Sequence, residues 1–359
     1  MNAFQLPRLR SALPLLLALT VLGPAPAAQS KSKKQRTVTV MTQNLYFGAD
    51  LTPLVAAPDL ETFLAAASQT WLDGQATSYA DRMAAVADQI ALAEPHLVGL
   101  QEVATWRTGA LGDPAPAEAV DTDFLALLIQ ALADRGLDYG AVAVAEGFDF
   151  EAPLFALGFD GRLTVSDALL AREDLPSSEL KVSNPQVGTY EVSFLLPSAL
   201  GPIPSPRQWA SVDAKVRGKQ LRFVTTHLES FSPLVRVAQA AELLAIHGGS
   251  GLRTAYVGDF NSVPGVAGDA AQLVLDSGAA DAWGALFPGA PGPTCCQDPD
   301  LLNPVSALDQ RIDLILVTGG LVPSAADVLG EDPADVAASG HWPSDHAGVV
   351  ATLDIVKTK

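Results

Sequence analysis

Residues 254–265 read TAYVGDFNSVPG, and this stretch decides the fold assignment. Its first five residues are typical of a short buried β-strand, and Asp259 stands where that strand ends. Asn261 follows two residues later, before a turn at Pro264–Gly265. Side chains at i and i+2 of an extended chain lie on one face, so we expect Asp259 and Asn261 to point to the same side. An Asx-type turn without a chemical role is the alternative interpretation.

Other strand-like segments are also followed by polar residues. TVTVMTQ, HLVGLQ and RFVTT have the alternation or apolar character of strands, and they precede Asn44, Glu102 and His227. Ligand sites in α/β sheets gather beyond strand ends, where loop residues from neighbouring strands meet. We therefore expect these polar residues and Asp259 to share one site.

Helical patterns alternate with these strands, at residues 79–94 and 234–246. The inward face of the second helix should carry Leu234, Val237, Ala241 and Leu244. Alternating strands and helices indicate α/β layers. With no clean linker inside residues 37–357, we expect a single catalytic domain there, in which residues 103–218 form a long elaboration.

The first 27 residues have the features of a secretory signal peptide. Arg8 and Arg10 precede an apolar run that ends near Leu22, and Ala25-Pro26-Ala27 resembles a cleavage site. The run is too short to span a bilayer, although an uncleaved anchor is the alternative. A basic linker is expected at residues 28–36, and the mature protein should be secreted or periplasmic, with no transmembrane segment.

The chain is acidic, with a formal net charge of -18. Four of its basic residues lie together in the linker, at Lys31, Lys33, Lys34 and Arg36. An acidic body repels long polyanions unless a metal ion or a local basic groove intervenes, so nucleic acid is possible but not favoured as a partner. The alternative is that the acidity serves solubility alone. The oligomeric state cannot be inferred from these features.

The only two cysteines, Cys295 and Cys296, are adjacent. A vicinal disulfide, two free thiols and a link to another chain are all compatible with an exported protein. No Cys/His spacing in the sequence indicates zinc, and we assign the pair no catalytic role.

The polar residues at the expected strand ends are rich in oxygen. The carboxylates are Glu102, Asp259, Asp313 and Asp345, the amides are Asn44 and Asn261, and the imidazoles are His227 and His346. Oxygen ligands suit Mg²⁺, Mn²⁺ or Ca²⁺, and a magnesium site usually takes only one or two protein carboxylates. The remaining acids and histidines are then available for proton transfer.

Six segments occur in the order typical of one family: QNLYFG, VGLQEV, THLES, GDFNSVP, RIDLIL and SDHAGV. Over about residues 37–355 the chain thereby resembles the endonuclease/exonuclease/phosphatase superfamily, which includes deoxyribonucleases and neutral sphingomyelinases. The resemblance implies a four-layer α/β/β/α sandwich of two mixed sheets flanked by helices. It also implies Mg²⁺ or Mn²⁺ as cofactor, with Glu102 as main ligand, Asn44 beside it and Asp345 reaching a second metal.

The same resemblance implies catalytic roles for five residues. Asp259 matches the residue that polarises the attacking water, and Asn261 matches one that holds a phosphate oxygen. His346 matches the histidine at the scissile phosphate, and Asp313 matches the partner that orients it. His227 matches a histidine of the deoxyribonuclease and sphingomyelinase branches, where it stabilises the phosphate or protonates the leaving group.

The function expected from these features is a secreted, divalent-metal-dependent phosphodiester hydrolase acting on a small or lipid phosphodiester, like a sphingomyelinase or phospholipase C. A secreted endonuclease for DNA or RNA is one alternative, and a non-catalytic binding protein on the same fold is another. The candidates for a nuclease groove are Trp106, Arg107, Arg207, Trp209 and Trp342. A lipid enzyme needs an exposed apolar edge, which residues 153–159 or 231–234 could provide, although both segments have the composition of core.

Overall fold

Two β-sheets stack face to face in the computed structural model, which describes residues 36–357. The expected signal peptide, and the expected linker except Arg36, lie outside the described residues. Strands of the first sheet run in the order β14-β15-β1-β2-β5-β4, with β3 paired to β2. Its strands are β1 Thr37–Asn44, β2 Leu97–Ala110, β3 Ala119–Asp123, β4 Tyr139–Leu154, β5 Phe159–Arg172, β14 Leu321–Leu329 and β15 Gly348–Ile355. The sheet is mixed, because β1 is parallel to β2 and antiparallel to β15.

The second sheet has the order β12-β13-β11-β10-β9-β6. Its strands are β6 Leu180–Thr189, β9 Gln208–Val216, β10 Lys219–His227, β11 Thr254–Asp259, β12 Ala280–Asp281 and β13 Asp313–Val317. This sheet is also mixed, since β11 is parallel to β10 and antiparallel to β13. A separate hairpin consists of β7 Phe194–Leu196 and β8 Ile203–Ser205.

Period-2 alternation along the strands produces a core on each side of each sheet. In β11, Ala255 and Val257 belong to the core between the two sheets, whereas Tyr256 belongs to a core on the opposite face. Successive side chains of a strand point to opposite faces, so apolar residues at every position require that both faces be covered. The buried run TAYVG therefore marks an inner strand of a sandwich.

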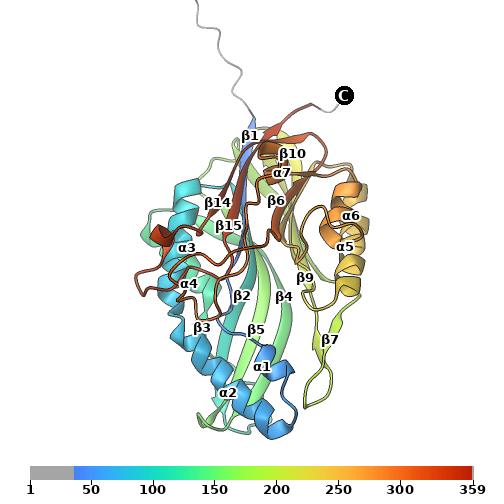
Figure 1. Ribbon diagram of the computed structural model, residues 1–359. Coiled ribbons are helices and arrows are strands. Elements are labelled where there is room, and N and C mark those ends of the chain that lie inside the picture. Colours follow the sequence, from blue (N-terminus) through green and yellow to red (C-terminus); the bar gives the residue numbers. More distant parts are fainter. Residues whose placement is uncertain (1–35, 358–359) are drawn as a thin grey trace, which may run out of the picture. The chain divides into compact units, whose positions relative to one another are not determined.

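Helices cover the two outer faces. On the first sheet these are α2 Leu60–Ala76, α3 Tyr79–Ala93 and α4 Phe124–Asp134, and on the second α5 Pro233–His247 and α6 Ala270–Asp276. Short helices are α1 Thr52–Val55 and α7 Ala282–Leu286, with 3₁₀ turns at Gly248–Ser250 and Pro333–Asp335. Figure 1 shows α2, α3 and α4 on one side of the strands and α5 and α6 on the other. The expected four-layer α/β/β/α sandwich is confirmed. Within the described residues, no helix has the length and apolar character needed to cross a membrane.

Two details of the expected secondary structure are wrong. The strand at Leu97 continues past Glu102 to Ala110, with a register shift between Leu100 and Val103 in its pairing with β5. Helix α5 buries a different face from the expected one, and Leu234 is 85% exposed. The buried face includes Arg236 and Gln239, whose side chains bond to the backbone of Glu229. Apolar periodicity missed this face because polar residues form part of it.

A chain of buried polar groups connects the two sheets. Thr42 Oγ1 donates to Gln101 Oε1 at 3.1 Å, and Gln101 Nε2 donates to Thr225 Oγ1 at 2.7 Å. Gly99 lies in the same region, where an added Cβ would sit 2.7 Å from Thr225 Oγ1 and from Val257 Cγ2. The missing side chain at Gly99 thus permits the close approach of the sheets.

Gly99→Val should destabilise the protein, because its side chain would force the sheets apart. Overpacking of this kind costs about 1–3 kcal/mol, and urea unfolding should show a correspondingly lower midpoint. Gly248→Ala is the control, since an added Cβ there meets nothing within 4 Å and φ is -68. We expect the control to change stability by less than about 0.5 kcal/mol. An unchanged midpoint for Gly99→Val would contradict the close sheet contact.

Candidate active site

Three predicted site residues form a row across the second sheet. The strand register pairs His227 of β10 with Asp259 of β11, and Asp259 with Asp313 of β13. Directly opposite residues of neighbouring strands have close Cβ atoms, so the pairing alone brings the three side chains together. The prediction that polar residues at strand ends gather at one edge is confirmed for this sheet.

Residues of the first sheet complete the arrangement. Glu102 has φ 54, a left-handed conformation that is uncommon for a residue with a side chain, and it lies at the irregularity in β2. Bulges of this kind re-aim a side chain, and they are frequent beside active sites. Asn44 then links the two sheets, because its Nδ2 lies 3.2 Å from Glu102 Oε1 and 3.2 Å from Asp259 Oδ2.

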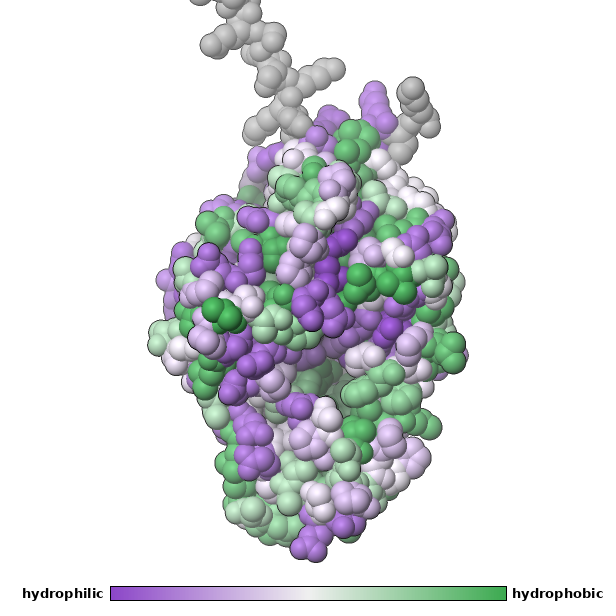
Figure 2. All heavy atoms as spheres, viewed as in Figure 1, coloured by the Kyte–Doolittle hydropathy of each residue, from purple (hydrophilic) through white to green (hydrophobic). Residues whose placement is uncertain are grey.

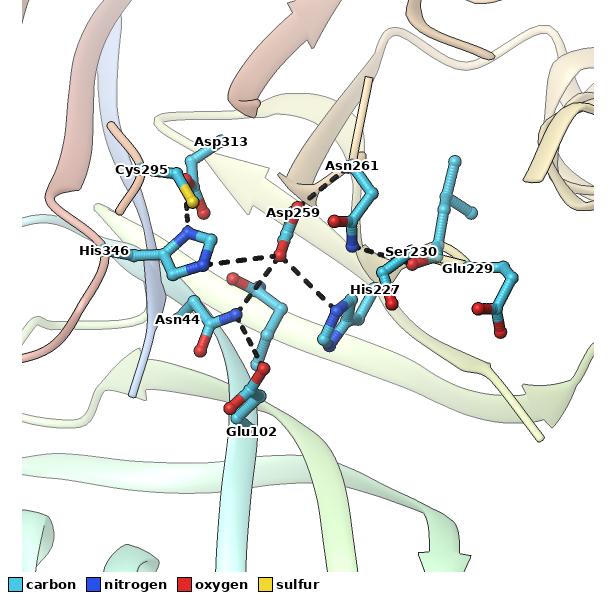
Figure 3. A network of polar contacts seen from close by, with 12 residues as sticks. Asn44, Glu102, His227, Glu229, Ser230, Asp259, Asn261, Cys295, Asp313 and His346 are labelled. Carbon is cyan, nitrogen blue, oxygen red and sulfur yellow. Dashed lines mark hydrogen bonds and ion pairs between the residues drawn. The ribbon is translucent and has the colours of Figure 1, made fainter. Parts of the chain in front are cut away.

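Asp259 lies at the centre of this network (Figure 3). Its Oδ2 is 3.4 Å from His227 Nε2 and 3.9 Å from His346 Nε2. Burial, followed by the neighbouring Asp313 carboxylate, raises the pKa of Asp259 to about 7. A carboxylate with a pKa near neutrality is suited to accept a proton from a bound water.

Asn261 reaches the pocket by a different route from the expected one. Its φ of 48 is left-handed, so the argument from an extended chain at i and i+2 is wrong. Its N–H donates to Asp259 Oδ1 at 2.8 Å, which is an Asx-type turn, and its Nδ2 donates to the Leu228 carbonyl at 3.0 Å. Asn261 therefore both forms an Asx-type turn and lines the pocket.

The surroundings of the two histidines shift their pKa values in opposite directions. Burial alone would lower the pKa of His346, but the carboxylates of Asp313, Asp345 and Asp259 raise it well above its ordinary value. Its Nδ1 lies 2.8 Å from Asp313 Oδ2, as expected for an orienting partner. Burial, and then the charge of Arg207, lower the pKa of His227 well below its ordinary value. Such a separation is typical of groups that divide proton donation and acceptance between them.

These side chains surround a pocket of about 440 Å³, which we call the catalytic pocket. Six of the eight predicted site residues line it: Glu102, His227, Asp259, Asn261, Asp345 and His346. Asn44 and Asp313 do not line the pocket. Asn44 contacts Asp259, and Asp313 contacts His346. The structure therefore brings all eight together, while their individual roles stay predictions.

Two further charged residues, Arg207 and Glu229, lie at the site but are not among the eight predicted site residues. The sequence places Arg207 only among the candidates for a nuclease groove, yet its Nη1 lies 3.0 Å from His227 Nε2. Glu229, which is fully buried, faces Arg207 at 3.5 Å. It stands in the THLES segment, two residues after His227, so the motif itself contained the signal. The buried carboxylate of Asp167 on β5 lies close enough to Arg207, Glu102 and Asp259 for their charges to shift its pKa, although burial raises that pKa most, and no sequence motif marks it.

The cysteine pair also lies at the site. Cys295 and Cys296 are joined as a vicinal disulfide in this structure. Both line the catalytic pocket, and Cys296 Sγ lies 4.0 Å from His346 Nε2. Their spacing in the sequence gave no indication of this position.

The site fits a hard divalent cation. Burial and the neighbouring Glu102 carboxylate raise the pKa of Asp345 to about 7, so a cation near these two residues would relieve their repulsion. Asp313 Oδ1 is buried without a hydrogen-bond partner. Asp259, Asp313 and His346 also offer ligand atoms within 4.8 Å of one another. A cation held by such residues neutralises phosphate charge and acts as a Lewis acid.

Comparison with family models decides the assignment. Residues 41–346 match the model of the endonuclease/exonuclease/phosphatase family. The chain belongs to this family. Endonuclease/exonuclease/phosphatase enzymes hydrolyse phosphoester bonds and depend on divalent metals, so the protein is a hydrolase acting on ester bonds. No curated protein matches the chain.

Solved structures of the endonuclease/exonuclease/phosphatase family share the fold. A family protein from Bacteroides thetaiotaomicron is 17% identical, with a TM-score of 0.56, over 90% of this chain and 100% of that one. TDP2 of D. rerio, solved with a single-strand DNA product, is 17% identical, with a TM-score of 0.52, over 89% and 99% of the two chains. A mannosyl-6-phosphatase from B. thetaiotaomicron is 18% identical, with a TM-score of 0.53, over 88% and 99%. At these identities the likeness establishes the fold alone.

Chelation should abolish hydrolysis of bis(4-nitrophenyl) phosphate, because the oxygen ligands need a cation to bind and polarise phosphate. We expect Mg²⁺ or Mn²⁺ to restore the rate after EDTA treatment, whereas Zn²⁺ alone should not. Glu102→Gln should raise the Mg²⁺ concentration needed for half-maximal rate while leaving the circular dichroism spectrum unchanged. Full activity after exhaustive chelation would refute the metal assignment.

His227→Ala, Asp259→Ala and His346→Ala should each lower kcat by about 10²–10⁴-fold, the range for lost acid–base or electrostatic groups. His341→Ala is a matched control, because His341 is a buried imidazole that does not line the catalytic pocket. Steady-state kinetics and thermal melting distinguish loss of chemistry from loss of fold. A near-normal kcat for any of the three variants would show that its assigned role is wrong.

Proposed function

We propose that this protein hydrolyses a phosphodiester that carries an apolar group, such as a lipid phosphodiester, with Mg²⁺ or Mn²⁺ and an activated water. One observation carries the proposal: the catalytic pocket adjoins a second pocket whose walls are apolar. Leu51, Phe148 and Leu196 line both. A substrate whose phosphate lies among the polar residues can therefore extend an apolar group into the neighbouring space.

The second pocket, which we call the apolar pocket, lies between helices α1 and α2, the ends of β4 and β5, and the β7–β8 hairpin. No charged residue lines it, and its only hydroxyl side chains are those of Thr70 and Ser198. Its volume is about 70 Å³, so it is small compared with the catalytic pocket. A small apolar space of this kind suits a short alkyl chain, because burying each methylene contributes about 0.8 kcal/mol.

The mouth of the catalytic pocket also carries exposed apolar side chains. Phe231 lines this pocket, is 51% exposed and stacks on Phe194 with ring centroids 6.1 Å apart. The interpretation of residues 231–234 as core is therefore wrong, since Leu234 is exposed as well. Figure 2 shows a central hollow with hydrophilic residues along its upper rim and hydrophobic residues at its right. This division supports a substrate with one polar and one apolar end.

In the proposed reaction each part of the site has one task. Asp259 accepts a proton from the attacking water, and the charged His346 faces the phosphate oxygens. Arg207, beside His227, adds a positive charge at the opposite wall. The raised pKa of His346 makes its Nε2–H the proton donor for the leaving group, and His227, whose pKa burial and Arg207 lower, can hydrogen-bond a phosphate oxygen. Glu102 and Asp345 would hold the divalent cation, which would supply charge neutralisation and polarisation of the phosphate.

A nuclease function is the second candidate, and Arg207 in the catalytic pocket is the observation that favours it. The aromatic residues considered for base stacking do not support it. Trp106, Trp209 and Trp342 are exposed by only 4%, 8% and 1%, and they belong to the cores. Stacking on single-stranded nucleic acid needs accessible aromatic faces, so these three residues are unsuited to it.

We also propose that the enzyme acts outside the cytoplasm. The basic start, short apolar run and small-residue cleavage site of residues 1–27 support this. A phosphodiesterase exported in this way meets lipid surfaces and free phosphodiesters alike. Detection of the mature chain, beginning at Ala28, in the medium or periplasm would test the localisation.

Alkyl 4-nitrophenyl phosphodiesters with chains from methyl to octyl test the substrate class. We expect kcat/KM to rise by up to about fourfold per methylene until the apolar pocket is filled. Ala152→Phe places a ring in that pocket and should flatten the dependence on chain length, with Ala67→Phe as a second pocket-filling variant. Ala156→Phe, at an exposed position in the β4–β5 turn, should keep the wild-type slope.

The same assay with duplex DNA at two salt concentrations distinguishes the second candidate, with His346→Ala as the blank. A nuclease that contacts several phosphates loses affinity steeply with salt, by roughly 0.9 log units per log salt for each phosphate neutralised. A flat response to chain length, together with a strong DNA preference and a steep salt dependence, would replace the lipid proposal with the nuclease one.

A further inference from the structure

The loop before β13 and the segment before β15 together present three soft ligand atoms at one wall of the catalytic pocket. Cys295, Cys296 and His346 each offer an atom within 4.8 Å of the others. Sulfur and imidazole ligands favour zinc-like cations, whereas the carboxylates described above favour magnesium. The pocket therefore contains two donor sets of different chemical character that meet at His346.

The backbone holds this loop against the segment around His346 independently of the disulfide. The N–H of Cys295 donates to the carbonyl of Gln310 at 3.0 Å, and the N–H of Gln310 donates back to Cys295 at 3.0 Å. On either side of the pair, Gln297 N–H donates to the Asp345 carbonyl at 2.9 Å, and Ala347 N–H donates to Thr294 at 2.8 Å. Opening the disulfide leaves these contacts in place, so both sulfur atoms stay beside the imidazole.

His346 is already oriented as a metal ligand. Its Nδ1 is bonded to Asp313 Oδ2, so Nε2 faces the pocket and Cys296 Sγ at 4.0 Å. Metal-binding histidines usually donate their other ring N–H to a carboxylate in this way. In a tetrahedral site with Zn–S and Zn–N bonds of ordinary length, sulfur and nitrogen lie about 3.6 Å apart. A small movement of the exposed Cys296 side chain spans the difference.

We propose that the reduced Cys295–Cys296 pair and His346 form a binding site for a soft divalent cation, such as Zn²⁺ or Cd²⁺. A dithiol reductant supplies two electrons and two protons, the S–S bond breaks, two thiols form and the reductant becomes a disulfide. The cation then displaces the two thiol protons and the Nε2 proton of His346, and it binds both thiolates and Nε2. The oxidised pair lacks thiolates, so cation binding depends on the redox state. This site goes beyond the proposed function and does not depend on the substrate.

Cadmium titration of the full chain tests the site. One sample is reduced with dithiothreitol and freed of it under nitrogen, and the other is left oxidised. Both contain excess Mg²⁺ to occupy the oxygen ligands. The readout is the ultraviolet charge-transfer band of cadmium–thiolate bonds, which is unambiguous because the chain has only two cysteines. We expect the reduced protein to bind one Cd²⁺ per chain with this band, and the oxidised protein to show none.

Variants separate the three ligands. Cys296→Ser should lower the band to one thiolate and weaken binding, and Cys295→Ser should do the same. Asp313→Asn should weaken Cd²⁺ binding by about 10–100-fold through the orientation of His346, the usual effect of losing such a partner. Asp309→Asn, the same change at an exposed position of the same loop, should bind like wild type.

Equal Cd²⁺ affinity in the two redox states, or binding without the thiolate band, would overturn the proposal. So would an unchanged affinity in Asp313→Asn, because His346 would then not be a ligand. The readout is spectroscopic and uses no substrate, so a wrong assignment of the phosphodiester would leave the result unaffected.

Discussion

The buried hydrogen-bond chain from Thr42 through Gln101 to Thr225 is the constraint on which the rest of the structure depends. It crosses from the first sheet to the second in a region where Gly99 lets them approach closely. A buried amide left without partners costs about 1–3 kcal/mol, so sliding one sheet over the other is unfavourable. Since the polar site residues come from strand ends of both sheets, this one alignment determines whether the site forms at all.

The pKa values of the site residues are set by their burial and by the charged groups next to each of them. Asp259 lies between two imidazoles whose pKa values are shifted in opposite directions, that of His227 downwards and that of His346 upwards. In addition to burial, the charge of Arg207 lowers the pKa of His227, and the carboxylate of Asp313 raises the pKa of His346. The arrangement resembles other acid–base pairs whose pKa values are separated by their surroundings. The same His346 is also the residue that the cysteine pair approaches, so one imidazole belongs to both donor sets of the pocket.

The sequence by itself determined the layers and the identity of the site residues. The uninterrupted apolar run TAYVG indicates a strand buried on both faces, and helical periodicity placed α3 and α5 within a few residues of their observed bounds. Asp259, His227 and Glu102 could be found because chemistry at a sheet edge requires polar residues after apolar strands. Because strand ends meet at one edge of a sheet, these three residues were expected to lie at one site. The roles of the individual residues stay predictions.

Only the tertiary structure decided features that depend on contacts between distant segments. The bulge that turns Glu102 into the pocket arises from pairing with β5, about sixty residues away. The exposed position of Phe231 and the buried polar face of α5 depend on what packs against them, which local periodicity does not contain. The cysteine pair lies beside His346 because backbone bonds join two loops fifty residues apart. The local pattern of apolar residues predicts which faces of strands and helices are buried. Side chains from remote loops, in contrast, meet only after the layers have packed.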